Sequence, residues 1–293
     1  MLLAYQVAFF FAATFMTAAS IITLRETLEA SIIVGIVLAY LQFTQNQRYS
    51  VIVWLGVFAG VVMSFVMALF FRIAFGGFEG RAEALYEGFA MLIGAGLITW
   101  MILWMLRQRS TIKSTVEEQV ALHLNNDHPL GLFFLVFLST AREGIETVIF
   151  LQAALVHSGG AWQMFGGLLG IAVAIVMSFL LFKGVVLLSL RQFFSVTSVL
   201  LILFAAGLTA HGVHELQEAS LLPIVIEHLW DINPIVATEG VYPLLHEKGA
   251  VGGLLKGLFG YNGNPSLLEL LSYLSYLIGI SVVWRAVSKV KKA

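Results

Sequence analysis

Long apolar runs alternate with short polar segments along most of this chain of 293 residues. A membrane-spanning helix needs about 20 mostly apolar residues, and seven runs reach that length. The pattern predicts spanning helices at 17–41, 51–72, 84–106, 130–156, 161–188, 193–215 and 267–287. The first 16 residues are also apolar but lack the positively charged start of a signal peptide. They either extend the first helix outward or precede a natural start at Met16.

Composition supports an all-α, polytopic membrane bundle. The chain is 59% hydrophobic and 11% charged, whereas soluble domains carry about 25% charged residues. We therefore expect an integral protein of the inner or plasma membrane, surrounded by lipid. The net charge of −1 gives no basic surface for nucleic acid. Because cysteine is absent, disulfides, thiolate sites and iron–sulfur clusters are excluded, and any metal must be held by oxygen or imidazole nitrogen.

Positive residues indicate the orientation of the bundle. With seven spans, the N-terminus shares one side with the 2–3, 4–5 and 6–7 loops. That side carries Arg72, Arg81, Lys248 and Lys256, whereas the other side carries ten positive residues. The positive-inside rule places the second side in the cytoplasm. The N-terminus is therefore expected outside and the C-terminus inside.

Two of the apolar runs contain the same five-residue pattern. The copies are Arg25-Glu26-Thr27-Leu28-Glu29 and Arg142-Glu143-Gly144-Ile145-Glu146. An ionisable group near the bilayer centre costs roughly 2.5–3.5 kcal/mol on insertion scales, so such groups usually mark an ion or substrate path. Two matching copies are difficult to explain by chance.

The motifs belong to a longer internal repeat. Their offset is 117 residues, and the segments 62–65 and 95–97 resemble 176–179 and 206–208 at similar offsets. We predict one three-helix unit at 17–106 and another at 130–215. Since each unit has an odd number of helices, the two copies must enter the membrane in opposite senses. Transporters built from such inverted repeats bind substrate near the midplane, between the repeats. A long extracytoplasmic loop at 216–266 and the helix at 267–287 lie outside the repeat.

A helical projection gathers the motif charges on one face. With Arg25 at 0°, Glu29 lies at about 40° and Glu26 at about 100°, whereas Thr27 lies on the back. Glu26 and Glu29 can grip one cation together, and Arg25 and Glu29 can form an i,i+4 ion pair when no cation is bound. If the first and fourth helices face each other, Glu26, Glu29, Glu143 and Glu146 converge with Arg25 and Arg142.

This set of charges favours a site for a multivalent cation. Four carboxylates and two guanidinium groups leave a charge of −2, and carboxylate oxygens prefer hard ions. The alternative is that buried Arg–Glu pairs only lock the packing of the helices. Two acids for each arginine leave an excess of negative charge that requires a cation or protons.

The doubled R-E-x-L/I-E pattern resembles the oxidase-dependent high-affinity iron permease family of bacteria and fungi. The resemblance covers essentially the whole chain, and three further segments carry it: Tyr86-Glu87-Gly88, Gly212-Val213-His214-Glu215-Leu216 and Leu258-Phe259-Gly260-Tyr261. It implies that the motif acids Glu26, Glu29, Glu143 and Glu146 bind iron during import, with Arg25 and Arg142 beside them. Thr27 stands where glycine is usual in this family, which affects close packing on the back face rather than metal binding.

The resemblance also implies partners and a cargo. Iron would be oxidised outside to Fe(III) by an extracytoplasmic oxidase or peroxidase, or delivered by an iron-binding protein. Iron would be the transported ion, with no tightly bound cofactor and no enzymatic activity. A negative-inside potential contributes about 2.3 kcal/mol per charge per 100 mV, so import needs no ATP, and the chain has no G-x-x-x-x-G-K-[ST] motif.

Acidic residues and histidines are concentrated at the predicted outer mouth. Glu79, Glu83 and Glu87 are spaced four apart, so on a helix they would form one stripe. The end of the sixth helix adds His211, His214 and Glu215, and His211 and His214 each lie four residues before an acid. An acidic mouth raises the local cation concentration. These residues are candidates for a transient metal site, and a solvated helix end is the alternative.

Two other function classes are compatible with intramembrane carboxylates. One is a permease for another metal such as lead or manganese, because hard carboxylates do not identify the ion. The other is an intramembrane metalloenzyme with carboxylate-bridged metals. Di-iron bundles carry paired Glu-x-x-His motifs, whereas the acid pairs here are Glu-x-x-Glu, which disfavours the enzyme.

Overall fold

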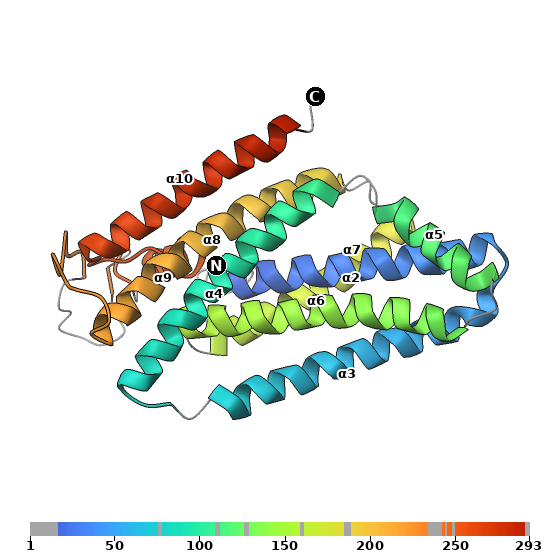
Figure 1. The fold of residues 1–293 in the computed structure, drawn as a ribbon, viewed down its shortest axis with the longest axis horizontal. Helices are drawn as coiled ribbons and strands as arrows, with labels where there is room; N and C mark the ends of the chain where they lie inside the picture. Colours follow the sequence, from blue (N-terminus) through green and yellow to red (C-terminus); the bar gives the residue numbers. More distant parts are fainter. Residues whose placement is uncertain are drawn as a thin grey trace, which may run out of the picture.

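The computed structural model describes residues 17–75, 78–108, 112–125, 129–158, 161–184, 189–233, 242–243, 245–247 and 250–290. Within these ranges the regular elements are helical (Figure 1). They are α2 (Ala18–Phe43), the 3-10 turn η1 (Gln47–Tyr49), α3 (Ser50–Phe75), α4 (Arg81–Gln108), α5 (Ile112–Asn125), α6 (Pro129–Ser158), α7 (Ala161–Phe182), α8 (Leu190–Glu218), α9 (Ala250–Phe259) and α10 (Leu267–Val290). The first 16 residues, whose role the sequence left open, lie outside the described ranges.

The expected all-α membrane bundle is confirmed. Five described helices are long and apolar enough to cross a membrane, namely α3, α4, α7, α8 and α10. The other two predicted spans correspond to α2 and α6, of 26 and 30 residues. Each contains the three charges of one motif, and this lowers its apolar character. Many large apolar side chains on the outer helices are exposed, as expected for surfaces that face lipid.

Some predicted boundaries were wrong. The fifth predicted helix, at 161–188, ends at Phe182, and Gly184 follows with a φ of 69°. A left-handed residue just after the last turn ends a helix, and glycine adopts it without strain. The structure also contains α5 and α9, of 14 and 10 residues, which are too short to span a bilayer. The helix α9 lies inside the predicted 216–266 loop.

The most extensive helix pairs are α2 with α7, α3 with α6, and α4 with α8. Each pair joins one helix from 17–106 with one from 130–215, so the two predicted three-helix units interlock. Small residues allow the close approach: a β-carbon at Gly60 of α3 would meet Thr140 of α6, and one at Gly170 of α7 would collide with Thr23 of α2. The inverted orientation of the two units stays a prediction, and the interlocked pairs are compatible with it.

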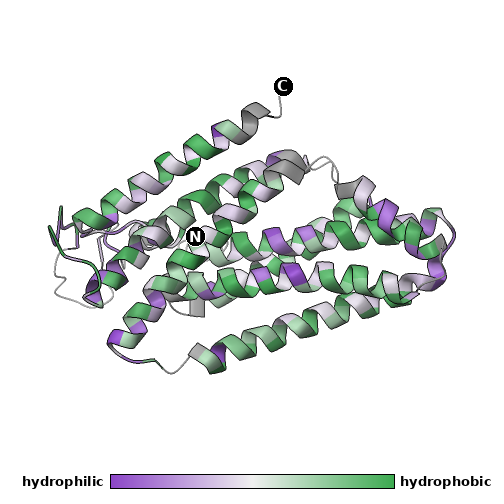
Figure 2. Cartoon of the chain, in the orientation of Figure 1, coloured by the Kyte–Doolittle hydropathy of each residue, from purple (hydrophilic) through white to green (hydrophobic). Residues whose placement is uncertain are grey.

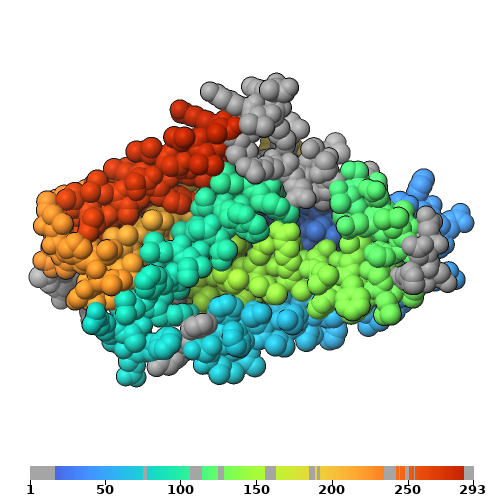
Figure 3. Space-filling view, viewed as in Figure 1, coloured from blue at the N-terminus to red at the C-terminus, as the bar shows by residue number. Residues whose placement is uncertain are grey.

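The core is formed where these pairs meet. One buried cluster joins α2, α4, α6 and α8 and includes Ile22, Ile98, Phe150 and Phe204. A second joins α2, α3, α5 and α6 around Val37, Val53 and Val136. In the space-filling view α4 crosses the visible face between α10 and α6 (Figure 3). Both motif-bearing helices therefore pack against several other helices, and α6 is also visible on this face of the molecule (Figure 3).

Candidate metal centre

Both five-residue motifs lie inside long helices and away from their ends. The first occupies α2 and the second α6, and the polar positions interrupt otherwise apolar ribbons in the middle of the bundle (Figure 2). Arg25 and Glu26 are 0% and 1% exposed, and Glu143 is 6% exposed. Charged side chains are almost never buried to this degree unless they are paired or bind an ion.

Three of the four predicted metal ligands converge. One carboxylate oxygen each from Glu26, Glu143 and Glu146 can be chosen so that all three lie within 4.8 Å of one another. The two helices therefore bring their motifs face to face, as the sequence analysis expected. Both oxygens of Glu26 are buried, and the side chain of Glu26 interacts with that of Glu143. Carboxylate oxygens so close together in a buried site repel each other, and a cation or shared protons would relieve that repulsion.

The fourth predicted ligand, Glu29, is held beside this group by an arginine. Arg25 Nε lies 3.0 Å from Glu29 Oε1, and Arg142 Nε donates to Glu146 Oε1 at 2.8 Å. These are the i,i+4 ion pairs that the spacing predicted, one in each motif. Arg25 Nη1 also lies 3.7 Å from Glu26 Oε1. The second acid of each motif is therefore neutralised by its own arginine, which leaves Glu26 and Glu143 as the central pair.

The back faces of the motifs serve helix packing. A β-carbon at Gly144 would collide with the side chain of Ser64 on α3, so glycine allows α3 and α6 to approach closely. Thr27 occupies the same motif position on α2 and is half-buried. The substitution of threonine for glycine thus falls on the packing face, and it leaves the carboxylates of α2 on the other face.

One motif position was missed by the sequence analysis. A threonine precedes the first glutamate by three residues in both copies, at Thr23 and Thr140, so the pattern extends to T-x-R-E-x-x-E. Thr23 Oγ1 donates within α2 to Ala19 and across to the carbonyl of Gly167 on α7, at 2.9 and 2.8 Å. Thr140 Oγ1 is buried and has no hydrogen-bond partner among the described residues. Alignment of the two copies beyond the five residues would have revealed this pair.

The acidic stripe predicted at the outer mouth is only partly correct. Glu83 and Glu87 lie on the first two turns of α4, but α4 begins at Arg81, so Glu79 precedes the helix. Gly80, with a φ of 60°, separates Glu79 from the helix and breaks the regular spacing. The carboxylates of Glu83 and Glu87 interact electrostatically with Glu215 near the end of α8. The two helix ends therefore do come together, as expected from the concentration of acids there.

The histidines of α8 have separate partners. His214 lies 3.2 Å from Glu218, the predicted i,i+4 pair, and its Nδ1 lies 3.0 Å from Glu269 Oε1 on α10. His211 is buried, and its Nδ1 lies 3.2 Å from the carbonyl of Gly207. Glu269, which is 1% exposed, was not among the predicted site residues. The signal was available, because Glu269 is an isolated acid at the start of the last apolar run.

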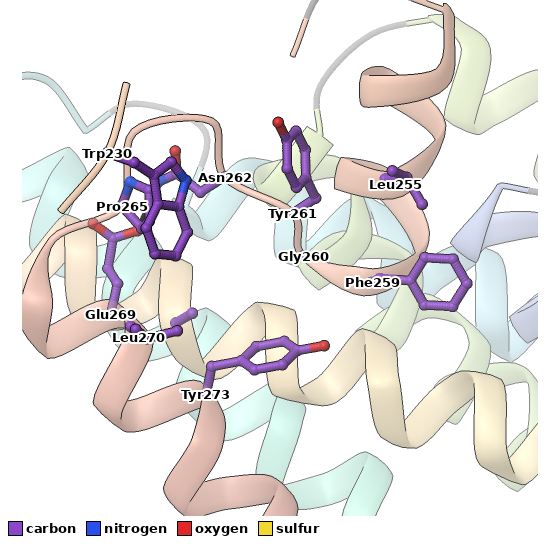
Figure 4. A pocket seen from close by; sticks show the side chains of 11 residues that line it. Trp230, Leu255, Phe259, Gly260, Tyr261, Asn262, Pro265, Glu269, Leu270 and Tyr273 are labelled. Atoms are coloured by element: carbon purple, nitrogen blue, oxygen red, sulfur yellow. Dashed lines mark hydrogen bonds between the residues drawn. The ribbon is translucent and has the colours of Figure 1, made fainter. Parts of the chain in front are cut away.

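A cavity of about 360 Å³ lies between α8, α9 and α10, near the Glu269–His214 pair (Figure 4). Its lining includes the aromatic side chains of Trp230, Phe259, Tyr261 and Tyr273. The carboxylate of Glu269 reaches its edge, where it accepts from Asn262 at 2.7 Å. None of the residues that line this cavity belongs to either motif, so it is distinct from the carboxylate centre.

The fold defines a polytopic membrane protein in which two helices bring buried carboxylates together. The comparison with known proteins gives this class a family: the model of the iron permease FTR1 family matches residues 16–291, and the chain belongs to that family. None of the solved structures matches the chain.

Curated relatives agree with this assignment. The ferrous iron permease EfeU of Escherichia coli O157:H7 is 35% identical over 260 residues, which cover 88% of this chain and 91% of the relative. The protein of the same name from Yersinia pestis is 31% identical over 260 residues, covering 88% and 89% of the two chains. The resemblance recognised from the doubled motif is therefore confirmed, and the chain is an iron permease by family.

Proposed function

We propose that this chain imports iron across the cell membrane through a site formed by Glu26, Glu29, Glu143 and Glu146. The observation that carries the proposal is the convergence of Glu26, Glu143 and Glu146 within 4.8 Å, from the middle of two helices. Glu29 joins as a fourth ligand when a cation draws it away from Arg25. Burial of six charged groups is costly, and ionisable groups inside a membrane usually mark an ion path. We therefore favour a role in transport over a role in helix packing alone.

The proposed bound ion is Fe(III), delivered by an extracytoplasmic oxidase, peroxidase or iron-binding protein. The relatives are named for ferrous iron, and the two forms are compatible if iron is oxidised before it reaches the carboxylates. Anionic oxygens are hard ligands and bind a small trivalent ion more strongly than a divalent one. A trivalent ion also gains most from a negative-inside potential, at about 2.3 kcal/mol per charge per 100 mV.

The proposed route begins at the acidic mouth formed by the ends of α4 and α8. Glu83, Glu87 and Glu215 lie close enough to interact electrostatically, and His214 is beside Glu218. His211 and Glu79 flank this group in the sequence and complete the mouth in the proposal. With the N-terminus outside and the C-terminus in the cytoplasm, the ion then passes inward to the motif glutamates. A permease for lead or manganese with the same site is the second candidate, since the ligand type fits those ions too.

The decisive experiment is uptake of radioactive iron into proteoliposomes that contain the purified chain. Wild type is compared with Glu26→Ala/Glu143→Ala and with the control Glu117→Ala/Glu118→Ala, which removes two acids outside both motifs. Fe(II) and Fe(III) are supplied separately, with lead and manganese as competitors. We expect Fe(III) uptake that the motif variant abolishes and the control retains. Normal uptake in the motif variant would refute the glutamate site. Transport of lead or manganese without iron uptake would show that the transported ion is not iron.

A further inference from the structure

The buried guanidinium of Arg25 contacts the sulfur atoms of two methionines on another helix. Its Nη1 donates to Met101 Sδ at 3.0 Å and its Nη2 donates to Met105 Sδ at 2.8 Å. Both methionines belong to α4 and are 2% and 3% exposed. A thioether sulfur is a weak acceptor, so these contacts orient the guanidinium without neutralising it. The charge of Arg25 therefore stays available for Glu29 and Glu26.

The arginine of the second motif rests on the same helix. The guanidinium carbon of Arg142 lies 4.2 Å from the ring centroid of Trp104, which is the geometry of a cation–π contact. Met101, Trp104 and Met105 are spaced i, i+3 and i+4, so they share one face of α4. One helix face thus contacts both motif arginines, although the two motifs are 117 residues apart and lie on different helices.

We infer that Met101, Trp104 and Met105 are positioning residues that hold Arg25 and Arg142 against the second acid of each motif. This inference rests on the proposed function of the motif glutamates. Held in this way, each arginine lies closest to the second acid of its motif, with Arg25 3.0 Å from Glu29 but 3.7 Å from Glu26, and Arg142 2.8 Å from Glu146. Sulfur and an aromatic ring suit the task, because they attract a guanidinium but do not compete for a hard metal ion.

Because α4 contacts both motif arginines, its position affects both motifs. The most extensive partner of α4 is α8, and α4 also contacts α6 and α10 (Figure 3). A displacement of α4 relative to α2 and α6 would move both arginines together. The two halves of the carboxylate centre therefore share one support, and a change in that support alters the affinity of the whole centre.

The first experiment measures iron uptake. It distinguishes the sulfur acceptors of Met101 and Met105 from the volume that these two side chains fill. Met101→Leu/Met105→Leu retains volume and removes the sulfur acceptors, and Met101→Gln/Met105→Gln restores an acceptor of similar length. Met91→Leu is the matched control, because Met91 is also on α4 and 2% exposed. We expect the leucine pair to raise the KM for iron uptake about tenfold, at unchanged Vmax per inserted protein, and the glutamine pair to restore it. Equal KM values for the leucine pair and Met91→Leu would overturn the inference.

The aromatic contact is tested on the same helix. Trp104→Leu should raise the KM and Trp104→Phe should retain most of the affinity, because Phe keeps a ring face for Arg142. Trp100→Leu is the control, since Trp100 is 58% exposed. If Trp104→Leu behaves as Trp100→Leu does, Trp104 has no positioning role.

A second experiment tests the contact between Arg25 and the two methionines without measuring iron transport. Its result is therefore independent of the proposed function. The methyl groups of methionine are labelled with ¹³C, and their NMR signals are assigned from the single leucine variants. Arg25→Lys should shift the signals of Met101 and Met105 and leave that of Met91 in place. Unshifted signals would overturn the Arg25 contact even in a protein that transports iron. Shifted signals in a protein that fails the uptake test would refute only the proposed function.

Discussion

Glu26 of α2 and Glu143 of α6 occupy the same position in the two motif copies, and a carboxylate oxygen of each lies within 4.8 Å of the other. Two acids at this distance in a buried site repel each other, because water screens them poorly there, and a bound cation would relieve that repulsion. In the proposed function, this pair lies at the centre of the site that a multivalent ion would occupy. The second acids, Glu29 and Glu146, are each paired with an arginine and complete the centre from its sides.

The two motif arginines should differ in their tolerance to lysine. Arg25 is fully buried, whereas the side chain of Arg142 is 39% exposed. Lysine keeps the charge but loses the planar fork, and at Arg25 this fork contacts two sulfurs and Glu29 at once. We expect Arg25→Lys to lower iron uptake by about tenfold or more and Arg142→Lys to have a smaller effect. Initial uptake rates in proteoliposomes, normalised to inserted protein, measure the difference. Equal losses would contradict the asymmetry.

The paired threonines of the extended motif should differ in stability. Thr23 ties α2 to α7 through the carbonyl of Gly167, whereas Thr140 Oγ1 has no hydrogen-bond partner among the described residues. Valine keeps the shape of threonine and removes the hydroxyl. We expect Thr23→Val to lower the free energy of unfolding by about 1 kcal/mol, and Thr140→Val to be neutral or slightly stabilising. Unfolding of the two variants in detergent, followed by circular dichroism, compares them directly. A greater loss for Thr140→Val than for Thr23→Val would contradict the prediction.

Gly207 and Gly260 pack so closely that a side chain at position 207 should not fit between them. A β-carbon on Gly207 of α8 would collide with the Cα atom of Gly260, which follows α9 and has a φ of 67°. The colliding atoms are backbone, so they cannot rotate away as a side chain does. We expect Gly207→Ala to displace α9 and lower the free energy of unfolding by about 1–3 kcal/mol. Gly96→Ala is the control, because a β-carbon there meets nothing within 4 Å. Limited proteolysis and thermal unfolding report the two effects, and equal behaviour of the two variants would contradict the prediction.

The interactions of Glu247 with Lys256, Gly263 and Asn233 should weaken at low pH. Its carboxylate accepts from Lys256, the Gly263 amide and Asn233, at 2.7, 2.8 and 2.9 Å. Burial acts to raise the pKa of Glu247, but the hydrogen bonds and the charge of Lys256 outweigh it, and the pKa is lowered from its ordinary value of 4.5. A depressed pKa stabilises the fold above about pH 4.5, and this stabilisation is lost as the pH falls through the lower folded value.

Glu247→Gln should remove this dependence on pH. We expect the wild type to lose hydrogen-exchange protection at 250–263 as the pH falls below about 4.5, and the variant to have low protection throughout. Exchange rates must be corrected for their intrinsic change with pH. Asp231→Asn serves as the control, since Asp231 lies in the same loop and its carboxylate accepts from the backbone amide of Asn233. A wild-type profile that parallels that of Glu247→Gln would contradict the role of the carboxylate.

Much of the architecture could be read from local pattern. Seven long apolar runs predicted seven long helices, and the i,i+4 spacing of Arg25 and Glu29 predicted their ion pair. These features depend on residues close together in the chain, where helical geometry alone fixes which side chains meet. Packing faces were less accessible. Thr27 and Gly144 were placed on the back of the motif, but the collision partner of Gly144, Ser64, is known only from the fold.

The sequence by itself determined the membrane environment, the helices, the doubled motif and the type of ligand that a metal would find. Tertiary structure alone decided which helices interlock, that Glu26 reaches Glu143, and that α4 contacts both arginines through Met101, Trp104 and Met105. The physical reason is that a methionine or tryptophan in an apolar run has the same local signal whether it faces lipid, core or a buried charge. Only the arrangement of helices in space distinguishes these environments.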